Sequence, residues 1–343
     1  MGKDVITFGI IGCGVISNWH AQAIAEIEGA RLKGVTDVFE PARIAFAEKY
    51  SVSAYDSAEA LLADPEIDAV CICTPSGLHA PLAISAANAG KNIVVEKPMA
   101  LTHEEIAEVL AACEKNHVKM SVISQLRFSK AIRALKGAID AGELGKIVLA
   151  DLSMKFFRSQ EYYDKGGWRG TWKMDGGGAL MNQGIHGIDM LQYVMGRVKS
   201  VSAITRTLAR KIEVEDTAVA ILEFENGALG QIVGTTSIYP GSSRTLEICG
   251  DHGTIKLTED AITEWEIEGK EQPKNVLNGG AGSDTSSDPT NFSISGHVEQ
   301  LTDMVDAIKN DRLPFINQFD GRLPVEIILA IYESSKTGKT VNL

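Results

Sequence analysis

The sequence predicts two domains, an α/β domain with a parallel sheet followed by an α+β domain with an antiparallel sheet. Up to residue 124, short apolar runs alternate with segments of helical periodicity, as in βαβ units. A glycine-rich turn follows the first apolar run, and from residue 147 the chain is rich in strand patterns joined by hairpin signals. We therefore expect domains at residues 1–124 and 125–343, with the C-terminal helices packing back on the first domain.

Size and charge exclude several classes of protein. The 343 residues suffice for two cores, and 44% hydrophobic with 23% charged residues is ordinary for a soluble globular protein. The net charge of −12 argues against a nucleic-acid groove, which needs clustered Lys and Arg. No run approaches a membrane span, and the N-terminus lacks the features of a signal peptide. Five cysteines, an odd number set mostly in apolar runs, indicate a reducing cytoplasm.

The first strand, expected at residues 5–11, leads into the pattern Gly12-x-Gly14-x-x-Ser17 and a helix. Gly12 permits a tight turn, and Gly14 lets the backbone approach a pyrophosphate. The start of the helix supplies N–H groups and a positive dipole. The expected dinucleotide-binding residues of this turn are Gly12, Gly14, Val15 and Ile16.

A second strand at residues 32–36 ends at Asp37, 23 residues after Gly14. A carboxylate there binds the ribose hydroxyls of a dinucleotide. No Arg directly follows Asp37 to bind a 2′-phosphate, so NAD is expected over NADP; Arg43 is the side chain that would admit NADP. The alternative role for Asp37 is a cap for the helix at residues 41–49.

Three more strands are expected at residues 69–73, 92–95 and 119–124, with helices at 81–89 and 104–116. Because ligands of an open parallel sheet lie at the carboxyl ends of its strands, the end residues should line one crevice. They are Gly12, Asp37, Thr74, Glu96, Lys97 and Gln125.

Lys97 follows its strand at the place where a nicotinamide ring is expected, and Pro98 stiffens the turn. A partly buried amine there can hydrogen-bond a reacting oxygen. The alternative is a solvated loop charge. Thr74, Pro75 and His79 are expected near the nicotinamide ribose, although His79 also suits the start of the next helix.

The second domain opens with a helix at residues 129–141, which Gly142 ends. Strands are expected at 147–157, 198–207, 217–225, 228–236, 244–249 and 254–258. Residues 269–295 are polar and predicted to form a surface loop, and helices at 296–310 and 323–336 close the chain.

A helix within residues 175–196 presents an unusual polar face. At 100° per residue, apolar side chains fall on one side, and Asn182, His186, Asp189 and Tyr193 fall on the other. An ordinary surface helix places Lys and Glu there. The face therefore indicates chemistry, with a satisfied interior histidine as the alternative.

Before this helix, residues 158–172 hold two Trp, two Tyr and two Arg around glycines. Aromatic rings stack on sugars, and Arg binds hydroxyl or carboxylate oxygens. Tyr163, Trp168 and Arg169 are candidate substrate residues, and Gln125 is another. An aromatic-anchored loop or a subunit contact is an equal alternative.

Four motifs in order along the whole chain resemble the glucose–fructose oxidoreductase / inositol dehydrogenase / MocA family: Gly9-Ile10-Ile11-Gly12-x-Gly14, Cys73-Thr74-Pro75-x-x-x-His79, Glu96-Lys97-Pro98 and Gly176-Gly177-Gly178…Asn182…His186-x-x-Asp189. The resemblance implies an α/β Rossmann domain plus an α+β domain with a large open, mostly antiparallel sheet. It also implies a homodimer or homotetramer built through that sheet, and NAD(P)-dependent oxidation or reduction of a sugar or cyclitol hydroxyl.

Carried over by motif, Lys97 and His186 are the catalytic residues. Many members have an Asp where this chain has Asn182, and a neutral amide cannot raise the proton affinity of the imidazole as a carboxylate would. Asn182-Gln183 resembles the nucleotide-sugar branch, notably UDP-N-acetylglucosaminuronate 3-dehydrogenases. Free or glycosidic sugars oxidised at C3 remain equally plausible substrates.

The expected mechanism is direct hydride transfer from the substrate to the nicotinamide. His186 takes the hydroxyl proton, Lys97 hydrogen-bonds the same oxygen, and Asp189 orients the imidazole. Asn182 and Gln183 hold neighbouring hydroxyls, and no metal is required. Two alternatives stay open: a non-catalytic NAD-binding regulator and an NAD-dependent glycosidase.

Overall fold

The computed structural model describes residues 4–165, 167–271 and 293–343. The chain divides into two compact units, one of Met1–Gln125 with Ile294–Arg322 and the other of Leu126–Ser293 with Leu323–Leu343. The second unit is therefore discontinuous, because residues 294–322 return to the first. Among the described residues, no helix combines the length and apolar character needed to cross a bilayer.

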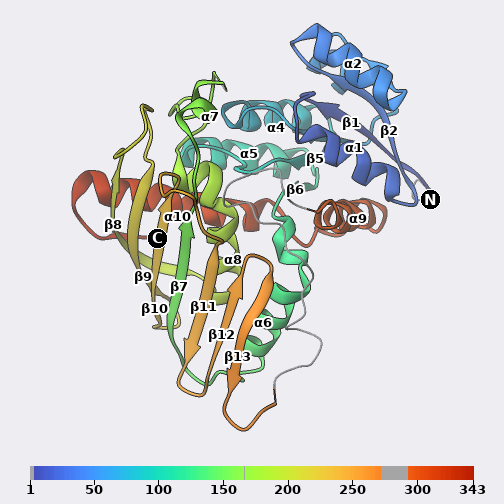
Figure 1. Cartoon of the computed structure of the whole chain (residues 1–343). Coiled ribbons are helices and arrows are strands. Elements are labelled where there is room, and N and C mark those ends of the chain that lie inside the picture. The colour runs from blue at the N-terminus through green and yellow to red at the C-terminus, as the bar shows by residue number, and fades with distance from the viewer. Residues whose placement is uncertain (1–3, 166, 272–292) are drawn as a thin grey trace. The chain divides into compact units, whose positions relative to one another are not determined.

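The first unit is a six-stranded parallel sheet in the order β3-β2-β1-β4-β5-β6 (Figure 1). Its strands are β1 (Ile6–Ile11), β2 (Ala30–Thr36), β3 (Ser53–Ala54), β4 (Ala69–Ile72), β5 (Asn92–Val95) and β6 (Met120–Val122). Its helices are α1 (Ser17–Glu26), α2 (Glu40–Tyr50), α3 (Ala58–Leu62), α4 (His79–Asn88), α5 (His103–Lys115) and α9 (Ser295–Lys309). All six residues of β1 are buried, as expected for a central parallel strand covered on both faces.

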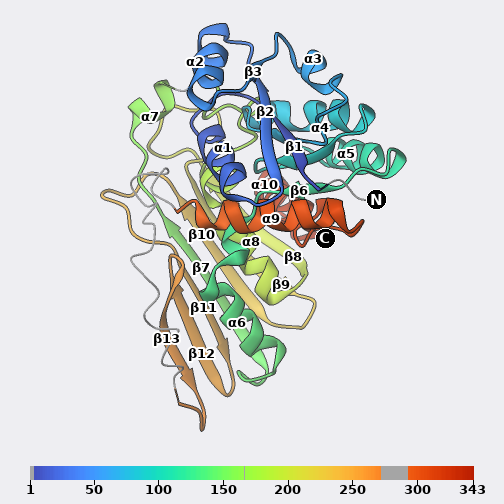
Figure 2. The ribbon, with the colours of Figure 1, turned by 90° about the vertical axis from the view of Figure 1, so that its right-hand side faces the viewer.

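Helix α9 comes from the C-terminal part of the chain and completes the core of the first unit. It lies beside α1 (Figure 2), and its Leu301, Met304 and Val305 join the buried cluster around β1. The Gln300 side chain ties it to β6, accepting from the Ser124 N–H at 3.0 Å and donating to the Val122 carbonyl at 2.8 Å. These contacts fix the residues at the start of α9 beside the ends of the strands.

The second unit is built on an eight-stranded sheet in the order β13-β12-β11-β7-β10-β9-β8-β14 (Figure 1). Its strands are β7 (Ile147–Lys155), β8 (Val198–Arg206), β9 (Thr217–Phe224), β10 (Leu229–Thr235), β11 (Thr245–Gly250), β12 (Gly253–Thr258), β13 (Ala261–Ile267) and β14 (Val341–Asn342). All described pairings are antiparallel except that of β7 with β10. The predicted fold class, a parallel-sheet domain plus a mostly antiparallel α+β domain, is confirmed.

Four helical elements precede or cover this sheet: α6 (Lys130–Asp140), α7 (Gln160–Asp164), a π-helix (Ala179–Gly184) and α8 (Ile185–Met195). Helix α10 (Gln318–Thr337) begins in the first unit and ends in the second. Most of the predicted 269–295 loop lies outside the described residues. Strands β3, β13 and β14 and helices α3 and α7 were not predicted, whereas the hairpin connections of the second sheet were.

Candidate functional site

The turn after β1 has the geometry of a phosphate-binding loop. Gly12 has a φ of +98°, and a Cβ there would lie 2.7 Å from the Cys73 carbonyl oxygen, so only glycine fits. Gly14 faces open space, with no atom within 4 Å of the position of a Cβ. Helix α1 follows with no side-chain cap and no acidic residue in its first turn. The positive end of the helix dipole therefore faces no acidic side chain in the first turn, which suits an anionic ligand.

Asp37 lies at the end of β2, where a ribose-binding carboxylate was expected. Its Oδ2 accepts from the Cys13 N–H and its Oδ1 from the Phe39 N–H, both at 2.7 Å. Two hydrogen bonds thus orient the carboxylate and leave further lone pairs for a ligand. Arg43 is held elsewhere, since its guanidinium binds the Asp56 side chain at 3.1 Å and the Asp56 carbonyl at 3.2 Å. This arrangement favours NAD over NADP.

Two polar atoms at strand ends of the first sheet are buried without a hydrogen-bond partner in the described part of the chain. They are Thr74 Oγ1 after β4 and Gln125 Oε1 after β6. A buried polar atom left unpaired costs about 1–3 kcal/mol. Both residues are among those predicted to line the crevice, and a bound dinucleotide or substrate would satisfy them.

His79, predicted near the cofactor, is the first residue of α4 and is almost fully buried. Its Nδ1 lies 2.6 Å from the Pro98 carbonyl oxygen and its Nε2 lies 2.9 Å from that of Thr74. Burial lowers the pKa of this imidazole. His79 therefore bridges the loop after β4 to the turn that carries Lys97.

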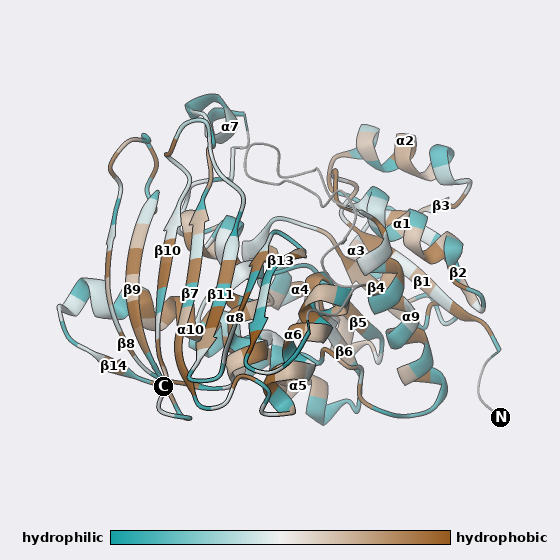
Figure 3. Cartoon of the chain, turned by 60° about the horizontal axis from the view of Figure 1, so that its bottom comes forward, coloured by the Kyte–Doolittle hydropathy of each residue, from teal (hydrophilic) through white to brown (hydrophobic). Residues whose placement is uncertain are grey.

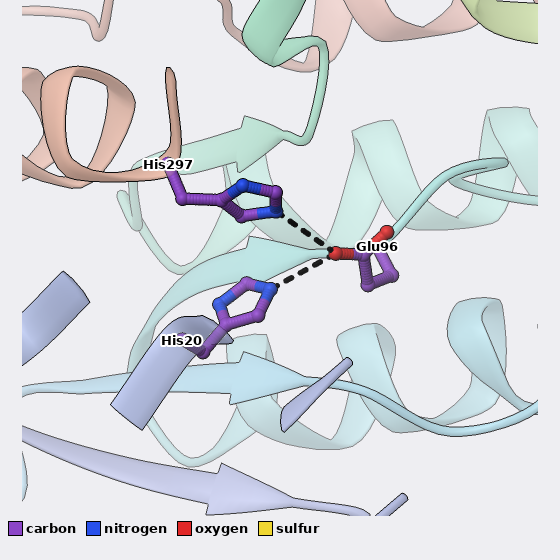
Figure 4. A group of neighbouring side chains, drawn as sticks. All are labelled: His20, Glu96 and His297. Carbon is purple, nitrogen blue, oxygen red and sulfur yellow. Dashed lines mark hydrogen bonds and ion pairs between the residues drawn. The ribbon is translucent and has the colours of Figure 1, made fainter. Parts of the chain in front are cut away.

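Three side chains of the first unit converge on the Glu96 carboxylate, next to Lys97 in the chain: His20 from α1, Glu96 after β5 and His297 from α9 (Figure 4). Glu96 Oε1 lies 2.9 Å from His20 Nε2 and 3.7 Å from His297 Nε2. Burial would raise the pKa of Glu96, but its bonds to both imidazoles hold it well below the usual range. Burial lowers the pKa of His20, but its interactions with Cys73 and Cys71 raise it well above its ordinary value. The pair is thus a buried ion pair.

This triad fixes the turn that carries Lys97. The second carboxylate oxygen of Glu96 accepts from the Lys97 N–H at 3.3 Å. Glu96 was predicted to contact the cofactor, but its carboxylate is turned toward the two histidines. Lys97 itself is half-buried.

In the second unit, the predicted polar helix has two parts. The π-helix carries Asn182 and Gln183, and α8 begins at Ile185, so His186 is its second residue and is half-buried. The wider π turn changes the angle between residues before and after it, so a single 100° wheel does not describe the face. Short π segments recur at functional sites.

Asn182 and Gln183 belong to a hydrogen-bonded chain that runs from a cation to an anion. The Arg158 guanidinium donates to Gln183 Oε1 at 3.0 and 2.8 Å, and Gln183 Nε2 donates to Asn182 Oδ1 at 2.8 Å. Asn182 Nδ2 then donates to the buried Asp175 carboxylate. The charged ends set the orientation of both amides. A carboxylate thus stands directly behind the amide that replaces the expected Asp.

Glu215 anchors the start of the π-helix. Its carboxylate accepts from the N–H groups of Gly178 at 2.9 Å and Leu180 at 2.8 Å, and from the Tyr332 hydroxyl at 2.9 Å. Burial raises the pKa of Glu215 to about 7.

One predicted role is wrong. Asp189 was expected to orient the His186 imidazole, but its two oxygens bind the Arg127 guanidinium at 2.9 and 2.6 Å. Both side chains are buried, and Arg127 also lies over the Tyr193 ring, 4.8 Å from its centroid. The C-terminal half of the polar face is therefore an internal ion pair that joins α8 to the segment before α6.

The predicted substrate residues of segment 158–172 also differ in where they lie. Tyr163 is buried, and its hydroxyl pairs with Thr236 Oγ1 at 2.8 Å, so it belongs to the interior rather than to a substrate surface. Its neighbour Tyr162 instead accepts from Gln183 Nε2 at 3.0 Å. Arg169 lies over the Tyr162 ring, 4.6 Å from its centroid, and 5.2 Å from the centroid of Trp168.

Four residues that support the site were not predicted: His20, His297, Asp175 and Glu215. Arg158 and Tyr162 lie in the predicted aromatic segment, but they were expected to contact the ligand rather than to hold Gln183. The acid preceding the three glycines was the available signal for Asp175. The histidines are separated by 277 positions in the chain, so no local pattern connects them.

A dinucleotide turn on a parallel sheet, joined to a mixed-sheet unit with a polar helix, defines a two-domain NAD-dependent oxidoreductase. The chain matches the model of the oxidoreductase family with an NAD-binding Rossmann fold over residues 6–124, and that of the GFO/IDH/MocA C-terminal domain over residues 132–256. It belongs to the GFO/IDH/MocA family, as the motifs indicated.

Among curated relatives, an uncharacterized oxidoreductase, YrbE, of Bacillus subtilis is 30% identical over 78% of this chain and 77% of its own length. The myo-inositol 2-dehydrogenase of Thermotoga maritima is 27% identical over 98% of each chain.

Among solved structures, the WlbA dehydrogenase from Bordetella pertussis, in complex with NADH and UDP-GlcNAcA, is 33% identical. Its TM-score is 0.90, and the match covers 100% of this chain and 99% of that one. A levoglucosan dehydrogenase in complex with NADH and levoglucosan shares the fold, with a TM-score of 0.87 at 24% identity over 98% of this chain and 99% of that one.

Proposed function

We propose that this protein oxidises or reduces one ring hydroxyl of a sugar or sugar derivative, with Lys97 and His186 acting on the same substrate oxygen. One observation carries the proposal: the Lys97 turn is fixed from behind by the His20–Glu96–His297 triad, next to the unpaired Thr74 hydroxyl. A surface loop lysine needs no such support. The first unit supplies the cofactor site, and the second unit supplies most of the substrate residues.

When bound, NAD supplies the hydride acceptor. Gly12, Gly14, Val15 and Ile16 hold its pyrophosphate, and Asp37 holds its ribose. Lys97 donates a hydrogen bond to the substrate oxygen and stabilises the negative charge that develops there.

His186 accepts the proton of the same hydroxyl. Asn182, held by Asp175, keeps its amide in one orientation toward neighbouring hydroxyls. The Gln183 amide group donates hydrogen bonds to Asn182 and Tyr162 and accepts from Arg158. Gln183 therefore positions Asn182 rather than binding the substrate itself.

The particular substrate proposed is a nucleotide sugar or a sugar oxidised at C3. The similarity to WlbA supports the former. An inositol is the second candidate, supported by the full-length similarity to the myo-inositol 2-dehydrogenase.

A homodimer or homotetramer is proposed through the open face of the second sheet. Ile204 and Val219 pair across β8 and β9, Leu149 and Leu229 pair across β7 and β10, and Ile221 lies between them. These side chains are exposed, with Ile221 at 62%. Figure 3 shows the hydrophobic stretches along these strands. Five free cysteines support a reducing cytoplasm as the compartment.

The test is NADH formation from NAD with a panel of UDP-sugars, free sugars, sugar acids and inositols. The proposal expects NADH from at least one class. Binding of NAD without NADH from any class would favour the regulator, and release of an aglycone without net NADH would favour the glycosidase.

A further inference from the structure

Two aromatic rings hold the Arg169 guanidinium, which donates no hydrogen bond to another described residue. It stacks on the rings of Tyr162 and Trp168, at 4.6 and 5.2 Å from their centroids. Among residues 4–165, 167–271 and 293–343 it has no hydrogen-bond acceptor and no carboxylate partner. The side chain is half-buried, so part of its hydration shell is already lost.

The guanidinium carbon lies over both aromatic rings, and the N–H donors of the group lie in its own plane. A planar fork of this kind matches the two oxygens of a carboxylate or a phosphate. The arrangement is therefore that of a preoriented anion receptor.

Two further arginines lie near this receptor. Burial raises the pKa of the Tyr162 phenol, the nearby cations Arg169 and Arg158 lower it, and the Asp175 carboxylate raises it. Arg210 lies 5.2 Å from the Phe157 ring centroid and donates to the Arg158 carbonyl at 2.6 Å.

The acids of this region are engaged elsewhere. Asp175 accepts from the Gly170 N–H at 2.8 Å and from Asn182. Asp216 accepts from the N–H groups of Leu208, Ala209 and Arg210 at 2.7 to 2.9 Å.

The anion receptor is connected to the proposed substrate residues within the second unit. The Tyr162 hydroxyl, on the ring under Arg169, accepts from Gln183, and Gln183 binds Asn182. Asn182 precedes His186 by four residues.

We propose that Arg169, stacked on Tyr162 and Trp168 and reinforced by Arg158, binds an anionic oxygen group of the substrate. The substrate is then an acidic sugar derivative, bearing a carboxylate or a diphosphate, rather than a neutral sugar or an inositol. This inference rests on the proposed function and narrows its substrate class.

The experiment compares four substrates that separate the two sources of charge: N-acetylglucosamine (neutral), glucuronate (carboxylate), UDP-N-acetylglucosamine (diphosphate) and UDP-N-acetylglucosaminuronate (both). NADH formation gives kcat/KM for wild type, Arg169→Gln, Arg169→Lys and the exposed neighbour control Lys165→Gln. Isothermal calorimetry gives the binding of each compound to the NADH-loaded protein, independently of turnover.

Wild type should prefer compounds with the recognised anion. Arg169→Gln should lower kcat/KM for them about 10- to 100-fold, mainly through KM, as expected for loss of a charge-assisted hydrogen bond. Arg169→Lys should recover part of the loss, and Lys165→Gln should match wild type.

Equal losses on neutral and anionic compounds, or no loss at all, would overturn the anion site while leaving the dehydrogenase function standing. Anion binding that depends on Arg169 but yields no NADH would instead sink the dehydrogenase function and keep the anion site.

Discussion

Gly12 and Gly14 are separated by one residue but face different surroundings. A methyl group at Gly12 would strike the Cys73 carbonyl and require a left-handed backbone, whereas one at Gly14 meets nothing in the protein. Gly12→Ala should therefore destabilise the fold by about 1–3 kcal/mol. Gly14→Ala should leave the melting temperature unchanged but weaken NADH binding, because the methyl group occupies the approach of the pyrophosphate. Thermal unfolding and NADH titration separate the two effects, and a Gly14→Ala protein that binds NADH normally would contradict the assignment.

His20, Glu96 and His297 carry three groups of the kind that bind metals, all buried and with ligand atoms within 4.8 Å of one another. A hydrogen bond explains this cluster without a metal ion, because His20 Nε2 and Glu96 Oε1 already lie 2.9 Å from each other.

We therefore expect purified protein to contain substoichiometric zinc by elemental analysis. Prolonged dialysis against a chelator should leave turnover unchanged. One tightly bound metal ion per chain, lost together with activity, would show that the triad is a metal site instead.

At the scale of the element, Glu215 sets the pH dependence of the π-helix anchor. Its pKa rises from 4.5 to about 7 because burial opposes its charge. As the pH rises, the Glu215 carboxyl group therefore loses its proton at a lower pH in the unfolded chain than in the folded chain. The stability that the group contributes is complete below pH 4.5, declines between pH 4.5 and 7, and is absent above, a change of about 3 kcal/mol.

Glu215→Gln cannot titrate, so the wild-type-minus-variant difference in unfolding free energy should fall between pH 4.5 and 7.5. Urea unfolding at several pH values in this range measures it. A difference that stays constant would mean that Glu215 is ionised in the fold throughout.

Most helices and strands were predicted from hydrophobic periodicity and from the turn and capping residues at their ends. The continuous apolar runs became β1, β4 and β5, and Thr102 caps α5 by accepting from the Glu105 N–H at 3.1 Å. Strand β3 has two residues and α3 has five, too few for any period to show. Strand β13 breaks its alternation at Thr263 and Glu264, two successive exposed residues where the register with β12 shifts.

Site residues could be predicted where a single residue at a strand end has a defined role, as with Gly12 and Asp37. They could not be predicted where the side chains that hydrogen-bond one another come from distant segments of the chain. Asp189 matched the polar face of a helix, but Arg127 lies 62 positions away and binds it. The π turn also displaced Asn182 from the wheel that placed it with Asp189.

At the scale of the whole molecule, the exposed apolar stripe across β7, β10, β9 and β8 predicts self-association. Ile221→Asp places a charge at its centre and should shift the protein toward a monomer of 36.8 kDa. Light scattering after size exclusion measures the mass, and Glu108→Lys on exposed α5 is the matched control. A wild-type protein that is already monomeric would contradict the interface.

In the proposed mechanism, Lys97 and His186 act on one substrate oxygen. The direct measurement is turnover of Lys97→Met and His186→Gln on the best substrate of the panel, with NADH affinity measured in parallel. We expect a loss of kcat of about 10²- to 10⁴-fold in each variant, with NADH affinity near wild type. Near-normal turnover in both variants would contradict it.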